Sequence, residues 1–169
     1  SDFWYLTGFD EPNAVALFLP YRPQGEQYIL FVMPKESSAE VWNGFRWGVK
    51  GVIDNFDVDI AHPLDQLPQK LADYLHGTEH IFFRIGKHPK IEPVVLKILS
   101  EELDRSARSG FPPMGLHSPS SILHKLRLRK DSWEIMRMRE AALISSKAHN
   151  LARQSTRPGM NEREIQAII

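Results

Sequence analysis

Histidine and aspartate are the residues of this chain that could bind a metal ion, and their spacing is the first test of such chemistry. Seven histidines are present and cysteine is absent, so a metal site would use imidazole and carboxylate ligands. His76 and His80 are four residues apart, a spacing typical of two ligands on one helix. Gly77 and Thr78 lie between them and indicate that the helix has already ended. We therefore interpret both histidines as surface loop residues.

A second candidate is the acidic segment with Asp54, Asp57 and Asp59, whose spacing resembles that of a calcium loop. An EF-hand loop also needs a central glycine and a distal glutamate, which this segment lacks, so we interpret it as a solvated acidic turn. The remaining histidines stand alone beside turns or prolines, or on a helix without a second ligand: His62, His88, His117, His124 and His149. The sequence has no G-x-S-x-G, phosphate-loop or G-x-G-x-x-G motif, so these residues do not make an active site.

Aromatic and basic residues gather in the segment 41–48, which contains Trp42, Arg46 and Trp47 between glycines. This composition predicts a loop, and two interpretations of it remain open. In the first, the loop packs on its own domain. In the second, its aromatic side chains contact a partner subunit or a ligand, because Trp and Arg are enriched in binding hot spots.

The elements that must position these residues are a series of strands and helices before residue 118. Apolar runs at 13–19 and 28–33, joined by a turn with Pro23 and Gly25, predict a hairpin. Leucines at helical spacing predict a helix over 64–76 that ends at Gly77. Further predicted elements are strands at 51–53 and 80–85 and a helix over 92–107. This order predicts an α/β domain with a mixed sheet flanked by helices.

A linker with four glycine and proline residues, at positions 112, 113, 115 and 119, separates a second unit. Asp131 and Glu134 form a capping-box pattern at the start of a helix predicted to end near Ser155, and Asn161 with Glu164 begins another. Residues 119–169 hold ten Lys/Arg and five Asp/Glu, whereas residues 1–118 hold eleven and sixteen. We therefore predict two units, 1–118 and 119–169, whose basic and acidic surfaces meet.

Bulk properties exclude some functions. No apolar run approaches the ~20 residues of a membrane span, and the basic unit lacks the interleaved aromatic residues that would favour nucleic-acid binding. The absence of cysteine excludes disulfides and is compatible with a cytoplasmic protein. The aromatic start, residues 1–9, is expected to be buried as core and strand, and the chain stops on two isoleucines within a predicted helix. Both ends therefore suggest a fragment.

Three segments together resemble a known family. They are Ser1-Asp2-Phe3-Trp4-Tyr5-Leu6-Thr7-Gly8-Phe9 with Glu11-Pro12, then Ala39-Glu40-Val41-Trp42-Asn43-Gly44, and finally residues 126–160, which end in Arg157-Pro158-Gly159-Met160. In this order they resemble Xaa-Pro aminopeptidase (aminopeptidase P), one of the creatinase and prolidase-like metallopeptidases. The resemblance covers essentially the whole chain.

The resemblance implies a layout and a reaction. Residues 1–118 would be a creatinase-type N-terminal domain whose start is missing, and residues 119–169 the first helices of a pita-bread catalytic domain. That domain binds two divalent metal ions, commonly manganese, and a bridging hydroxide hydrolyses the bond before proline in peptides with proline second. Its two Asp, one His and two Glu ligands lie beyond residue 169. This segment is therefore expected to contain no catalytic or metal-binding residue and to be inactive alone.

The resemblance also assigns two substrate-pocket residues. Trp42 lies in the motif from which a tryptophan reaches the active site of an adjacent subunit, which implies a homodimer or homotetramer. Arg108 is the candidate for an arginine that faces the active site, and the alternative is an exposed cation at a helix C-terminus. Two other functions remain open for the protein: a prolidase or creatinase-like enzyme, and a non-catalytic homologue that binds peptides or a protein partner.

Overall fold

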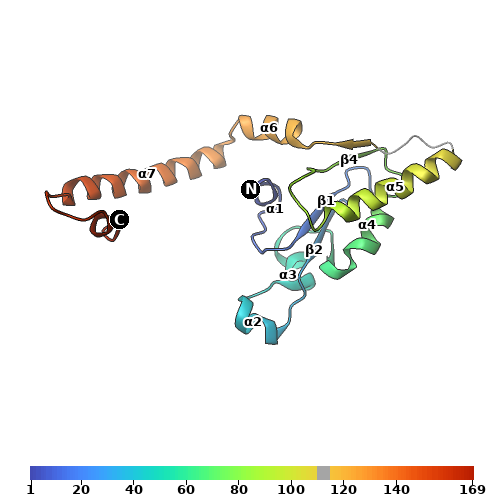
Figure 1. Ribbon diagram of the computed structural model, residues 1–169, viewed down its shortest axis with the longest axis horizontal. Helices are drawn as coiled ribbons and strands as arrows, with labels where there is room; N and C mark the ends of the chain where they lie inside the picture. Colours follow the sequence, from blue (N-terminus) through green and yellow to red (C-terminus); the bar gives the residue numbers. More distant parts are fainter. Residues whose placement is uncertain (110–114) are drawn as a thin grey trace. The chain divides into compact units, whose positions relative to one another are not determined.

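The computed structural model describes residues 1–109 and 115–169, without the side chains of residues 37, 39, 43 and 106–109. The chain divides into two compact units, Ser1–Ser120 and Ser121–Ile169. The helices and strands of the first unit (Figure 1) are α1 (Asp2–Thr7), β1 (Val15–Phe18), β2 (Tyr28–Val32), α2 (Ser37–Asn43), α3 (Gly48–Asn55), β3 (Ile60–Pro63), the 3-10 turn η1 (Leu64–Gln66), α4 (Leu67–Leu75), β4 (His80–Phe82), α5 (Glu92–Ser109) and β5 (Gly115–His117). No helix in the described ranges is both long and apolar enough to cross a membrane.

The larger sheet of the first unit has the strand order β1-β2-β3. The pairing of β1 and β2 is antiparallel, with Val15 opposite Phe31, which confirms the predicted hairpin. The pairing of β2 and β3 is parallel, with Ile29 opposite Ile60. The sheet is therefore mixed, and the predicted α/β class is confirmed.

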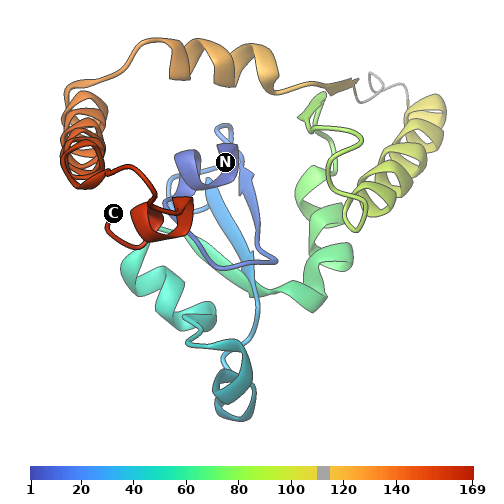
Figure 2. The same ribbon diagram turned by 60° about the vertical axis from the view of Figure 1, so that its left-hand side comes forward.

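The central strand β2 is buried on both faces. Ile29 and Phe31 pack into one apolar cluster with the leucines of α4 and with Val95 and Ile98 of α5. Leu30 and Val32 point the other way, because side chains alternate along a strand, and they pack with Phe9 and with Val52 of α3. Figure 2 shows α3 on one side of the sheet and α4 on the other. All four of these β2 side chains are 0% exposed, so β2 is the centre of the domain.

A second, small sheet pairs β4 with β5 in parallel, with Ile81 opposite Leu116. The linker predicted from the prolines is therefore wrong at residues 115–117, which form a strand. The main-chain pairing decides this, because the N–H of Phe83 donates to the carbonyl of His117 and the N–H of Gly115 donates to that of Glu79. Pro112 and Pro113 lie outside the described residues.

Two further sequence predictions are wrong. Residues 51–53 belong to helix α3 and not to a strand, because Val49, Val52 and Phe56 recur at helical spacing and pack into one cluster. The aromatic start forms helix α1 and not a strand: Ser1 caps it, and Gly8, with φ of 65°, ends it. Phe9, just beyond this helix, is buried, whereas 53% of Trp4 is exposed.

The second unit contains α6 (Ser120–Leu128), α7 (Ser132–Ser155) and α8 (Glu162–Gln166). Both predicted capping boxes are confirmed. At α7 the Glu134 N–H donates to Asp131 Oδ1 at 2.8 Å, and Glu134 Oε2 accepts from the Asp131 N–H at 2.9 Å. The apolar side of α7 is largely exposed, as Met138 and Ile144 show at 58% and 69%.

Candidate functional site

Trp42 lies on the short helix α2, so the loop predicted for residues 41–48 is wrong at 41–43 and at Gly48, which begins α3, and is confirmed at 44–47. Residues 37–43 contain neither glycine nor proline, so the backbone can close a helix there. Gly44 ends the helix, with φ of 79°. Figure 1 shows α2 at the margin of the first unit, beyond the end of β2. We refer to residues 35–48 as the α2 corner.

Polar contacts fix the α2 corner to the domain. The Trp47 N–H donates to Glu11 Oε1 at 2.7 Å, and Arg46 Nη1 lies 3.7 Å from Glu11 Oε2. The Glu11 and Arg46 side chains are only 8% and 14% exposed. Within the corner, the Arg46 N–H donates to Glu40 Oε1 at 2.9 Å, and Lys35 Nζ lies 3.9 Å from the same oxygen. The segment that carries Trp42 is therefore held at a defined place.

A close backbone approach joins the two ends of the α2 corner. Gly48 has φ of 65°, and a Cβ at this position would lie 2.7 Å from the Cβ of Lys35. Any other residue would therefore clash with Lys35 and also adopt a strained backbone conformation. The chain enters the corner at Lys35, after the end of β2, and passes back beside Lys35 at Gly48, where α3 begins.

The two tryptophans of the corner have different environments. Trp47 packs edge-to-face against Phe56 and Phe45, with ring centroids 5.4 and 5.0 Å apart, and joins the cluster around Phe9. In contrast, 87% of Trp42 and 79% of its neighbour Val41 are exposed. A large aromatic side chain exposed on a fixed helix is typical of a binding surface.

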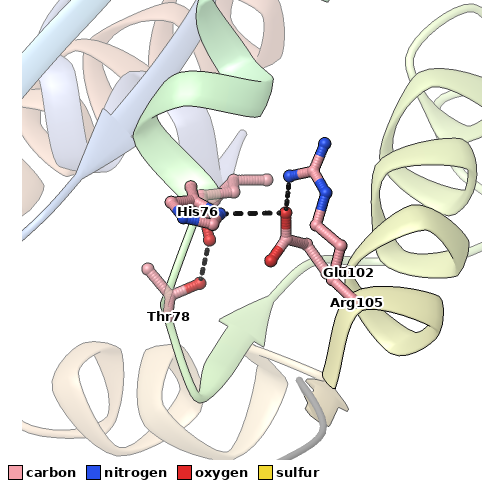
Figure 3. A network of polar contacts seen from close by, with 5 residues as sticks. His76, Thr78, Glu102 and Arg105 are labelled. Carbon is pink, nitrogen blue, oxygen red and sulfur yellow. Dashed lines mark hydrogen bonds and ion pairs between the residues drawn. The ribbon is translucent and has the colours of Figure 1, made fainter. Parts of the chain in front are cut away.

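The second candidate, Arg108, belongs to helix α5, and its side chain lies outside the described residues. A polar network earlier on this helix joins it to α4 (Figure 3). Glu102 Oε1 lies 3.1 Å from His76 Nδ1 and accepts from Arg105 Nη1 at 2.5 Å. Burial alone would raise the pKa of Glu102, but the hydrogen bonds and positive charges of His76 and Arg105 outweigh it and lower that pKa. The network therefore fixes α5 to the end of α4 at Glu102, six residues before Arg108.

The acidic segment also has a structural role that the sequence did not reveal. Asp59 Oδ2 accepts from the N–H groups of both Gln27 and Tyr28, at 2.8 Å each. This carboxylate therefore fixes the start of β2 and is not simply solvated. The interaction spans more than thirty residues, so local spacing gave no signal of it.

Two histidines predicted to be isolated have close partners instead. His62 Nε2 lies 2.8 Å from the hydroxyl oxygen of Tyr74, and its pKa is lowered by burial and by the charge of Lys70. His117 Nε2 lies 3.0 Å from His80 Nδ1 across β5 and β4. In the part of the chain that the structure describes, no three His, Asp or Glu side chains gather to hold a metal ion. The described residues thus do not fit a dinuclear metal centre.

The sheet order, the helices on both of its faces and the α2 corner define a mixed α/β domain. Residues 1–82 match the family model described as the aminopeptidase P N-terminal domain. The resemblance inferred from the sequence is therefore confirmed, and residues 1–82 belong to the aminopeptidase P N-terminal domain family.

Individual relatives agree with this assignment. Xaa-Pro aminopeptidase of Escherichia coli is 31% identical over 170 residues, which covers 100% of this chain and 38% of the relative. The structure of Pseudomonas aeruginosa aminopeptidase PepP is 32% identical, with a TM-score of 0.88 over 99% of this chain and 38% of that one. Zinc-substituted E. coli aminopeptidase P in complex with product is 29% identical, with a TM-score of 0.87 over 98% and 38%. The chain thus spans little more than a third of the proteins it matches.

Proposed function

We propose that this chain is part of a cytoplasmic Xaa-Pro aminopeptidase, a metallopeptidase that removes the first residue from peptides with proline second. Its relatives carry that name, and the similarity extends along the whole chain. Two divalent metal ions, manganese in the first instance, would activate the attacking water. The ligands would come from residues outside this chain, since the described residues offer no cluster of three. The zinc-substituted relative in complex with product supports metal dependence.

This proposal assigns different tasks to the two predicted domains. Residues 1–118 form the N-terminal domain, which supports assembly and the substrate pocket. Residues 119–169 are the linker and first helices of the pita-bread catalytic domain. The exposed apolar side chains of α7, such as Met138 and Ile144, would be covered by the remainder of that domain. The segment alone would then be inactive, which a peptidase assay of the 169-residue chain with added Mn²⁺ tests directly.

Within this function, Trp42 contacts the substrate pocket of an adjacent subunit in a homodimer or homotetramer. The observation that carries this assignment is the 87% exposure of Trp42 on a helix that is fixed at both ends. An anchored, exposed tryptophan loses little conformational entropy when it enters a neighbour's pocket. The contact would therefore contribute to substrate binding without contributing to the stability of the subunit that carries it.

The test is Trp42→Ala in the full-length enzyme, with Tyr21→Ala as the matched control. Tyr21 is 100% exposed and lies on the hairpin turn. A hot-spot contact predicts a loss of about tenfold in kcat/KM for Trp42→Ala and none for Tyr21→Ala. Unchanged kinetics and unchanged assembly of Trp42→Ala would contradict the assignment.

Subunit mixing tests whether Trp42 acts between subunits. Trp42→Ala subunits retain their metal ligands, whereas a second variant lacks the metal ligands but keeps Trp42. Mixed oligomers place an intact Trp42 beside an intact metal site of the neighbouring subunit, so part of the lost activity should return. If mixing restores no activity although mixed oligomers form, Trp42 does not act in trans.

Arg108 is assigned to the substrate side of the domain, and Arg108→Lys separates this role from a helix-end charge. Lysine keeps the positive charge that favours a helix C-terminus, but it lacks the planar bidentate fork of arginine. A substrate contact predicts a higher KM with unchanged thermal stability. If Arg108→Lys has the same kcat and KM as the original enzyme, Arg108 is a helix-end cation and not a substrate contact.

A further inference from the structure

Two histidines from neighbouring strands meet on one face of the small sheet. The register places His80 opposite Gly115 and Phe82 opposite His117. Because side chains alternate along strands, these four residues share a face. His80 Nδ1 and His117 Nε2 are 3.0 Å apart, and both side chains are exposed. Their rings lie edge-to-face with centroids 4.9 Å apart.

Gly115 makes room for this approach. A Cβ at this position would lie 2.8 Å from His117 Nε2 and 3.3 Å from His80 Nδ1. The φ of Gly115 is not in the left-handed region, so its backbone conformation does not require glycine. What the missing side chain provides is the space in which the two ring nitrogens face each other.

The distance between the nitrogens suits two ligands of one metal ion. With metal–nitrogen bonds of about 2.0–2.1 Å, a separation of 3.0 Å corresponds to an angle of about 91–97° at the metal. That angle is the one between adjacent ligands in square-planar or tetragonal coordination, which Cu²⁺ and Ni²⁺ prefer, and it is narrower than the tetrahedral angle of Zn²⁺. Neutral imidazole is a good ligand for all three ions, and Cu²⁺ binds most tightly in the divalent series.

We propose that His80 and His117 form a binding site for a divalent transition-metal ion, with Cu²⁺ the preferred occupant and Ni²⁺ next. In the metal-free state an N–H of one ring donates a hydrogen bond to the free nitrogen of the other. On binding, that proton moves through water to the other nitrogen of its own ring, so that both facing lone pairs point at the ion, and water completes its coordination. The bound ion links β4 to β5, the strand that follows α5 in the sequence. It therefore stabilises the small sheet.

Titration of the untagged 169-residue chain with Cu²⁺ alone tests the proposal. Calorimetry measures the affinity and stoichiometry, and electron paramagnetic resonance reports the nitrogen ligands. One equivalent should bind with a splitting pattern from two nitrogens. Losing one of two ligands held in place should weaken binding about a hundredfold, so His80→Gln and His117→Gln should both show this loss. The control His124→Gln, which removes an exposed histidine from α6, should bind like the original chain. Equal affinity of all three variants would overturn the proposal.

Gly115→Ala is a second, independent test because it leaves both imidazoles in place. The added Cβ occupies the space between the ring nitrogens, so Cu²⁺ affinity should fall to the level of the single-histidine variants. Ni²⁺ should raise the Tm of the original chain and of His124→Gln but not that of Gly115→Ala. A single-nitrogen spectrum in the original chain, or full affinity in Gly115→Ala, would show that the histidines do not act together.

Discussion

The two units of this chain are stabilised in different ways. In the first unit, strand β2 is 0% exposed from Ile29 to Val32 and packs into two clusters drawn from distant parts of the sequence. In the second unit, α7 has its capping box while many of its apolar side chains stay exposed. The comparison teaches that non-local packing determines the sheet domain, whereas neighbouring residues suffice to define the helix. This difference predicts which substitutions should lower the stability of each unit, and by how much.

Phe31→Ala should have the largest effect, because it removes a fully buried aromatic side chain from the centre of the sheet. The free energy of unfolding of the first unit should fall by about 3–5 kcal/mol. Urea unfolding with amide exchange by NMR measures this change in each unit. Tyr21→Ala, at a fully exposed position, should stay within about 0.5 kcal/mol. If amide-exchange protection in α7 falls by a comparable amount, the two units are not stabilised separately.

Lowering the pH should reduce the free energy of unfolding of the first unit by an intermediate amount, because Glu102 becomes protonated. Because the folded-state pKa of Glu102 is lowered, its contribution is complete above the ordinary glutamate pKa and is lost as the pH falls through the lowered value. Glu102→Gln should therefore cost about 1–2 kcal/mol at neutral pH, and less as the pH falls.

Urea unfolding at a series of pH values from neutral to acid measures the free energy of unfolding of Glu102→Gln and of the original chain. The difference between the two should shrink as the pH falls. The control is Glu101→Gln, whose pair with Lys97 is more exposed, with N and O 3.9 Å apart. It should differ little from the original chain at any pH. If the difference between Glu102→Gln and the original chain stays constant as the pH falls, the network with His76 and Arg105 does not depend on the Glu102 charge.

Asp131→Ala should have the smallest effect, confined to the second unit. It removes the side chain that accepts the Glu134 N–H, which costs about 1 kcal/mol of helix stability. Amide exchange in the first turn of α7 should accelerate, while the protection of β2 should not change. Asp131→Asn keeps an acceptor and should restore most of the protection. Loss of protection in β2 would show that the cap also stabilises the sheet domain.

The parts of the fold that were predictable follow this division. Both capping boxes, the hairpin and helices α4 and α5 have local patterns, and the structure confirms them. Residues 51–53 and the aromatic start were assigned to strands, because short apolar runs suit strands and helices alike until packing decides. The strand β5 was missed because its partner is distant in the sequence.

Less of the candidate site than of the fold could be predicted from the sequence. The position of Trp42 came from a family motif, and its role stays a prediction, as does that of Arg108. The sequence placed Trp42 and Trp47 in one segment, but it could not show that one is exposed while the other packs on Phe56. It also gave no sign that His80 and His117 meet, since their contact depends on the register of two strands.

The strand register also has a consequence for the order in which the domain forms. The β1–β2 hairpin joins residues that are close in sequence, whereas β2–β3 and β4–β5 each close loops of about thirty residues or more. Contacts of longer sequence separation form later on average. On the ribosome, the hairpin can form early, but β4 has no partner until His117 has left the exit tunnel. Until then its edge is exposed, and the nascent chain is open to mispairing at that strand.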